Sequence, residues 1–196
     1  ALIARAEILF NRKHFDQALT DYRQLKAKAT TAERRQLAAT GMLRSAAMMQ
    51  DDVETIAAAT DMLAEAKLTP ELRNEALYFR AKAYLNQQAD KKAMNDLQAL
   101  AKDTRTLYGA EAKYLVALQL YKAHEYAAAE KEILNFIEQS TPHAYWLARS
   151  FILLSDVYVA MDKKLDARQY LLSLQQNYHA DDDIEQMINE RLEKLK

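Results

Sequence analysis

The sequence contains no cysteine, which excludes disulfide bonds and thiolate metal sites. Two glycines and two prolines leave little of the turn chemistry that β-hairpins and glycine-rich phosphate loops require. No apolar run approaches the roughly 20 residues that a membrane-spanning helix needs. The net charge is -1, from 27 basic and 28 acidic residues, so bulk charge does not favour a nucleic-acid or acidic-lipid partner.

Helix-forming residues dominate what is present. Alanine, leucine, lysine, glutamate and glutamine are abundant, and hydrophobic residues make up 50% of the chain. These residues have high helix propensity, so an all-α fold is expected. Apolar periodicity predicts helices over 2–11, 15–29, 33–48, 52–66, 71–87, 90–102, 109–123, 126–139, 143–161, 164–177 and 183–195. Thr69-Pro70 and Thr141-Pro142 are each expected to be an N-cap followed by proline at the first helical position.

A repeat with a period of 36 to 38 residues runs through the chain. It is marked by one position near the start of the second helix of each unit, occupied by Ala18, Ile56, Ala93, Ala129 and Ala167. Large apolar residues mostly follow four and seven positions later, on the same helical face. Twelve residues before each mark lie Ala6, Arg44, Ala81, Ala117 and Ser155. Small residues on both helices allow the close crossing of a helical hairpin.

These units resemble tetratricopeptide repeats (TPRs). They share the small residue of the first helix, a Tyr or Leu three positions on, the alanine of the second helix and, as Phe15 and Tyr126, an aromatic residue before it. The second unit departs most, because Arg44 and Ile56 replace both small residues. The resemblance implies a right-handed α-solenoid of about five helical hairpins with a C-terminal capping helix. The expected units are 1–31, 32–68, 69–105, 106–141 and 142–179, with the capping helix at 182–196, in a single domain over 1–196.

Catalytic and metal-binding signatures are not found in the sequence. The four histidines lie beside turn signals and lack the spacing of a helical metal site. The acidic triplet at 181–183 lacks the spaced ligands and the glycine of a calcium loop, so it is expected to cap a helix. The sequence therefore favours a protein that is not an enzyme and has no cofactor.

A binding groove is implied by the resemblance, since first helices of successive TPR hairpins line a concave face. The positions that match here are Tyr78, Lys82, Tyr114, Leu118, Tyr121, Lys122, Arg149, Ile152 and Asp156. Their charges are of both signs, which does not favour capture of an acidic C-terminal tail. For the tyrosines the alternative is packing between neighbouring hairpins, and for Trp146 packing is the expected role.

The expected function is a scaffold that binds a peptide or a partner helix. The alternatives are a structural or self-associating segment and a cytosolic regulatory domain. The run STPHAYWLARSFILLSDVY is similar to tandem TPR regions of bacterial cell-envelope proteins, which implies an envelope-associated adaptor. The chain starts at Ala1 within a helical pattern, so it is expected to be part of a longer protein.

Overall fold

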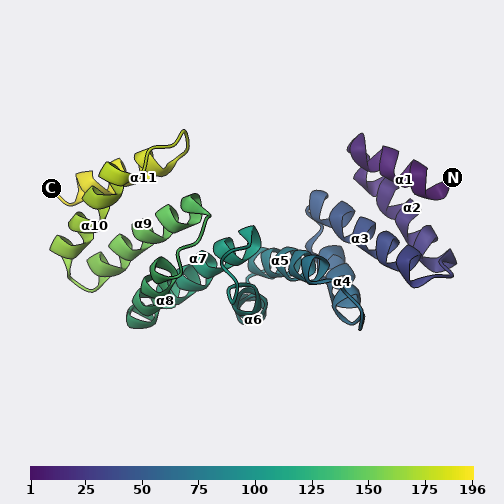
Figure 1. The fold of residues 1–196 in the computed structure, drawn as a ribbon, viewed down its shortest axis with the longest axis horizontal. Coiled ribbons are helices and arrows are strands. Elements are labelled where there is room, and N and C mark those ends of the chain that lie inside the picture. The colour runs from purple at the N-terminus through teal and green to yellow at the C-terminus, as the bar shows by residue number, and fades with distance from the viewer. The chain divides into compact units, whose positions relative to one another are not determined.

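Eleven α-helices and no β-strand make up the computed structural model, which describes all residues, 1–196 (Figure 1). The helices are α1 (Leu2–Asn11), α2 (Phe15–Lys28), α3 (Ala32–Met48), α4 (Asp52–Leu63), α5 (Pro70–Asn86), α6 (Asp90–Leu100), α7 (Leu107–Lys122), α8 (Tyr126–Glu138), α9 (Ala144–Ala160), α10 (Lys164–Asn177) and α11 (Ile184–Lys194). The all-α prediction is confirmed, and each predicted boundary lies within three residues of the observed one. None of these helices combines the length and apolar character of a membrane span.

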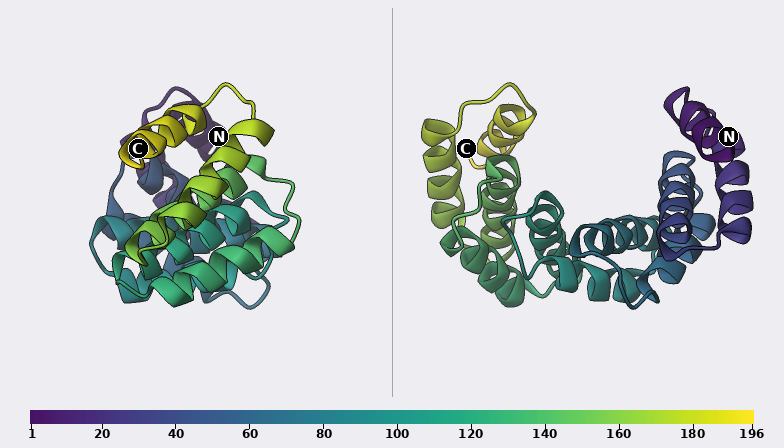
Figure 2. Two further views of the ribbon diagram at one scale, coloured as in Figure 1. Left: turned by 90° about the vertical axis from the view of Figure 1, so that its left-hand side faces the viewer. Right: turned by 45° about the vertical axis from the view of Figure 1, so that its right-hand side comes forward.

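The chain divides into two compact units, residues 1–96 and 97–196, which are described separately. The first contains the hairpins α1–α2 and α3–α4, then α5 and the first part of α6. The second contains the hairpins α7–α8 and α9–α10 and ends with α11. Within each unit the alternation of helix and short turn can be followed in both views of Figure 2.

Every hairpin turns through the same backbone motif. One residue after the first helix has a positive φ, between 56° and 64°, and in order these are Lys13, Gln50, Gln88, His124 and Asp162. The N–H of the next residue donates to the carbonyl five residues earlier, at 2.7 to 3.1 Å. This is the bond of a Schellman motif, which satisfies a carbonyl at the end of a helix. The five turns are therefore equivalent in structure, although none contains glycine.

This motif fixes the register of the second hairpin and corrects one prediction. Counting back seven residues from each positive-φ residue gives Ala6, Ala81, Ala117 and Ser155 in four hairpins, but Leu43 in the second. Leu43 is fully buried, whereas Arg44 is exposed. In α4 the matching residue is the buried Thr55 and not Ile56. The prediction that Arg44 and Ile56 stand at the close crossing is therefore wrong by one residue.

The core of each unit is assembled from small and large apolar side chains on facing helices. One cluster of the first unit joins α1, α2 and α3 through Ala6, Ala18, Tyr22, Leu25 and Ala38. In the second unit α9, α10 and α11 share a cluster of Ala148, Ile152, Leu171, Leu174, Ile184 and Ile188. The apolar side of α11 thus covers the last hairpin, as expected of a capping helix.

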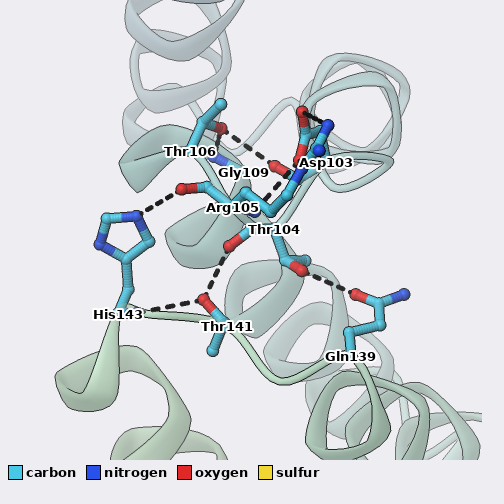
Figure 3. A network of polar contacts seen from close by, with 8 residues as sticks. All are labelled: Asp103, Thr104, Arg105, Thr106, Gly109, Gln139, Thr141 and His143. Atoms are coloured by element: carbon cyan, nitrogen blue, oxygen red, sulfur yellow. Dashed lines mark hydrogen bonds and ion pairs between the residues drawn. The ribbon is translucent and has the colours of Figure 1, made fainter.

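A polar network joins two loops of the second unit (Figure 3). The Thr104 hydroxyl donates to the Gln139 side chain at 2.9 Å, and the Thr141 hydroxyl donates to the Thr104 carbonyl at 2.7 Å. His143 Nε2 lies 2.8 Å from the Arg105 carbonyl. The predicted role of Thr141 as N-cap is wrong, because α9 starts at Ala144 with His143 as its N-cap. Thr141 instead fastens the α8–α9 loop to the α6–α7 loop.

Gly109 allows the α6–α7 loop to close on the start of α7. The Thr106 hydroxyl accepts a hydrogen bond from the Gly109 N–H at 3.0 Å and donates one to the Asp103 carbonyl, also at 3.0 Å. A Cβ on Gly109 would lie well inside van der Waals contact with that carbonyl oxygen. By comparison, the predicted cap at Thr69 is confirmed, since its hydroxyl accepts from the Leu72 N–H at 3.3 Å.

Candidate functional site

The residues predicted to line a groove are distributed over both units. Tyr78 and Lys82 lie on α5 of the first unit and are half-buried. The Lys82 ammonium lies 5.9 Å from the centre of the Tyr78 ring, and the Tyr78 ring meets Phe79 edge-on with centroids 5.5 Å apart. The other seven predicted residues lie on α7 and α9 of the second unit.

Arg149 joins three helices of the second unit and is not a free surface cation. Its Nη2 donates to the Tyr114 hydroxyl at 3.1 Å, and its Nη1 donates to the Tyr145 hydroxyl at 3.2 Å. Nη1 also lies 3.4 Å from a carboxylate oxygen of Asp183, the residue before α11. Burial raises the pKa of Tyr145 above its ordinary value. Arg149 therefore positions α7, α9 and the start of α11 relative to one another.

Tyr114 and Ile152 are part of the packed interior. Tyr114 is only 6% exposed, and its ring lies against Trp146 with centroids 5.6 Å apart. Ile152 is 1% exposed and belongs to the core cluster shared with α10 and α11. The prediction of Ile152 as a groove residue is not supported by this position, because a partner cannot touch a buried side chain. For Tyr114 the structure favours the packing alternative, and Arg149 contacts both its hydroxyl and its ring.

A hollow of about 540 Å³ lies over α7, α9, α10 and α11, and we call it the C-terminal hollow. It is lined by Tyr121, Ser155, Asp156, Val159, Lys164, Glu190, Arg191, Lys194 and Leu195. Of the predicted residues, the structure brings Tyr121 and Asp156 together here. Lys122 is exposed at the end of α7 and Leu118 is half-buried, and neither lines the hollow.

Some charged side chains of the C-terminal hollow already have partners within the protein. Arg191 donates from Nε and Nη2 to the Asp156 carboxylate at 2.8 and 3.0 Å. Glu190 accepts a hydrogen bond from Gln186 at 2.9 Å. Burial raises the pKa of Tyr121, and the neighbouring Asp156 carboxylate adds to the increase. Two exposed lysines, Lys164 and Lys194, therefore provide the cationic groups that are available to a ligand.

Charged, polar and apolar side chains line the C-terminal hollow. The Ser155 hydroxyl is buried and has no hydrogen-bond partner within the protein. No histidine lines the hollow, and the Ser155 hydroxyl makes no hydrogen bond to a carboxylate or a lysine of the lining. No group of three or more His, Asp or Glu side chains is arranged to hold a metal ion. Exposed Val159 and half-buried Tyr121 and Leu195 add apolar and aromatic surface beside the lysines.

Sequence reasoning missed two parts of the candidate surface. It gave the last helix only a capping role, although Glu190, Arg191 and Lys194 line the C-terminal hollow. It also assigned no groove residue to the first two hairpins. The first unit nevertheless contains a hollow of about 540 Å³ over α1, α2, α3 and α5, which we call the N-terminal hollow. The available signal was Gly41, because a glycine within a helix usually has a packing or functional reason.

Comparison with known proteins supports the fold and leaves the function open. No protein-family model and no curated protein sequence matches the chain. The structure is similar to a solved Podosopora anserina protein, described as a kinesin light chain with nearly identical TPR-like repeats, with a TM-score of 0.65 at 15% identity. The match covers 89% of this chain and 92% of that one. A TPR protein from Parabacteroides merdae also matches, with a TM-score of 0.48 at 14% identity, over 97% of this chain and 83% of that chain. The chain therefore has a TPR-like helical-repeat fold.

Proposed function

We propose that this chain is a non-catalytic scaffold that binds a segment of a partner protein in the C-terminal hollow. The observation that carries the proposal is the combination of Tyr121, Val159 and Leu195 with two exposed lysines around one concavity of about 540 Å³. Tyrosine and aliphatic side chains supply contact area, and lysines supply polar anchoring. The volume is within the range of about 300 to 1,000 Å³ found for ligand-binding clefts.

The ligand expected from this lining is a peptide or helix with acidic and apolar side chains. Lys164 and Lys194 attract carboxylates, while Arg191 is already held by Asp156. Exposed charges of this kind mainly increase the association rate and the specificity. The apolar residues then contribute most of the affinity once water has been expelled.

The absence of cysteine permits a direct test. A single cysteine at Val159→Cys, carrying a photo-activated crosslinker, should capture a partner from an extract of the source organism. Leu165→Cys is the matched control, because Leu165 is 82% exposed on the neighbouring helix α10 and does not line the hollow. A partner captured from Val159→Cys and not from Leu165→Cys supports the proposal, and equal capture from both contradicts it.

A second test separates binding from stability. The change Tyr121→Ala with Lys194→Ala should reduce capture while the helical content and the melting temperature remain close to those of the parent chain. Ile152→Ala should instead lower the melting temperature, since it opens a cavity in the core of α9, α10 and α11. If Tyr121→Ala with Lys194→Ala mainly destabilises the chain, these residues are structural.

Envelope association also stands as part of this proposal. Its support is the resemblance of the run STPHAYWLARSFILLSDVY to tandem TPR regions of bacterial cell-envelope proteins. Fractionation of the source cells with an antibody against the chain tests it, and recovery in the cytosolic fraction contradicts it. The concentration dependence of the solution mass tests the alternative of a self-associating segment.

A further inference from the structure

The N-terminal hollow lies in the first unit and is built by four helices. It is lined by Glu7, Phe10, Asn11, Tyr22, Glu33, Gln36, Leu37, Thr40, Gly41, Arg44 and Leu72. These residues come from α1, α2, α3 and α5, so helices from three successive hairpins contribute to one concavity. Its volume of about 540 Å³ equals that of the C-terminal hollow.

The floor of the N-terminal hollow depends on Gly41. The Tyr22 ring of α2 lies so close to α3 that a Cβ on Gly41 would overlap the ring carbons. Tyr22 is only 6% exposed, which shows that the ring is held in place by its surroundings. Burial raises the pKa of the Tyr22 hydroxyl, the Glu7 carboxylate adds to the increase, and the Arg44 guanidinium opposes it.

The walls of the N-terminal hollow offer apolar surface. Leu37 is 40% exposed and shares the lining with Phe10 and Leu72. Asn11 and Gln36 add amide groups that are suited to hydrogen bonds with a peptide backbone. A side chain that enters the hollow can therefore bury apolar area while its backbone keeps polar partners.

The rim of the N-terminal hollow is acidic. Glu7 and Glu33 are exposed carboxylates of the lining. Arg44 is the only cation of the lining, and it donates from Nε and Nη2 to the two carboxylate oxygens of Glu75 at 2.5 and 2.9 Å. A bidentate pair of this geometry neutralises the guanidinium locally. The lining therefore carries two carboxylates, Glu7 and Glu33, and one cation that is already paired with Glu75.

We propose that the N-terminal hollow is a second binding site, which takes a protein segment carrying lysine or arginine beside a large apolar side chain. The apolar side chain contacts Phe10, Leu37 and Leu72, and the cation lies against Glu7 and Glu33. This preference is opposite in sign to that of the C-terminal hollow, where Lys164 and Lys194 are the available charges. The two hollows therefore select different segments.

The proposal is tested by selecting random linear peptides, displayed on phage, against the intact chain. Selected peptides are sorted by competition into two groups. One group no longer binds the Leu37→Ser variant, and the other no longer binds the Val159→Ser variant. Leu37 and Val159 are both 40% exposed, so neither change removes a core residue. Peptides lost with Leu37→Ser should be enriched in lysine or arginine next to leucine, isoleucine or phenylalanine.

Charge reversal then measures the electrostatic contribution to the affinity of such a peptide for the N-terminal hollow. Glu7→Lys with Glu33→Lys should weaken binding of such a peptide by about tenfold, because two exposed ion pairs are lost. The control is Glu65→Lys with Glu185→Lys, which changes the net charge equally at exposed residues that do not line the N-terminal hollow. This control should change the affinity by less than about twofold.

Three outcomes overturn the proposal: no selected peptide depends on Leu37, the dependent peptides are acidic, or both charge reversals weaken binding equally. If no selected peptide depends on Val159, that result counts against the function proposed for the C-terminal hollow and does not contradict the N-terminal site. The melting temperature of each variant shows whether a lost interaction reflects unfolding.

Discussion

Arg191 and Asp156 are joined by two hydrogen bonds, 2.8 and 3.0 Å long, which fasten α11 to α9 beside the C-terminal hollow. Both side chains are about three-quarters buried, with 26% and 25% of their surface exposed. The pair therefore lies between a surface ion pair, which contributes about 0.2 to 1 kcal/mol, and a fully buried pair. It also fixes the position of the last helix, on which one wall of the hollow depends.

Breaking this pair should cost about 1 to 2 kcal/mol of unfolding free energy. The change Arg191→Met removes the charge but keeps much of the apolar stem that packs on α9. A double-mutant cycle with Asp156→Asn, followed by urea denaturation, isolates the coupling between the two residues. A coupling energy below about 0.3 kcal/mol would show that α11 is held by its apolar face alone.

Arg80 and Asp96 form a more deeply buried pair in the first unit. Arg80 donates from Nε and Nη2 to the Asp96 carboxylate at 2.8 and 2.7 Å, and the side chains are 19% and 5% exposed. Asp96→Ala should therefore cost about 3 kcal/mol, since it leaves a guanidinium without its partner. Asp61→Ala is the matched control, because Asp61 is 66% exposed and lies 3.4 Å from Lys26. Its cost should be below about 1 kcal/mol, and similar costs for both changes would contradict the assignment.

Replacing Gly109 by alanine tests the close approach of the α6–α7 loop. Intrinsic helix propensity favours alanine over glycine by about 1 kcal/mol, so a stabilising effect is expected from propensity alone. The structure predicts the opposite, a loss of about 1 to 3 kcal/mol, because the new Cβ would overlap the Asp103 carbonyl. Thermal unfolding followed by circular dichroism distinguishes the two, and a higher melting temperature in Gly109→Ala would contradict the loop geometry.

Alkaline pH should unfold the second unit in a way that depends on two tyrosines. Burial raises the pKa of Tyr158 and of Tyr178 from 10.0 to about 12, with help from Glu130 and from Asp182 respectively. The protonated hydroxyls thus stabilise the folded chain fully below about pH 10, and this contribution is lost as the pH rises towards 12.

The double change Tyr158→Phe with Tyr178→Phe should make the stability less dependent on pH in that range. Urea denaturation at several pH values between about 9 and 12 gives the slope of the unfolding free energy against pH for the parent and for the variant. Equal slopes would show that these hydroxyls do not control the alkaline transition.

Much of the fold was predictable because helical hairpins follow from local patterns. The apolar period and the recurring small residues placed all eleven helices correctly. The prediction failed for the register of the second hairpin. Its close crossing uses Leu43 and Thr55, so no small residue marks it. The register of this hairpin is given by the backbone turn at Gln50, which residue preferences do not predict.

The candidate site was less predictable, because exposure depends on packing between helices. Tyr114 and Ile152 carry the spacing of surface residues, but α9 and α11 cover them in the folded chain. Conversely, Glu190 and Lys194 have the pattern of a solvent face but line a concavity. Helical spacing shows which residues share a face, and only tertiary contacts show what covers that face.

The hairpin turns contain a non-glycine residue in left-handed backbone at all five equivalent places. This conformation costs about 1 to 2 kcal/mol per residue, so helix packing and the hydrogen bond of each turn must offset it. Lysine, glutamine, histidine and aspartate all occupy the position, which shows that the side chain there is nearly unconstrained. Turn sequences can therefore diverge without altering the angle at which two helices meet. A helical-repeat geometry shared at only 15% identity is the expected result of such freedom.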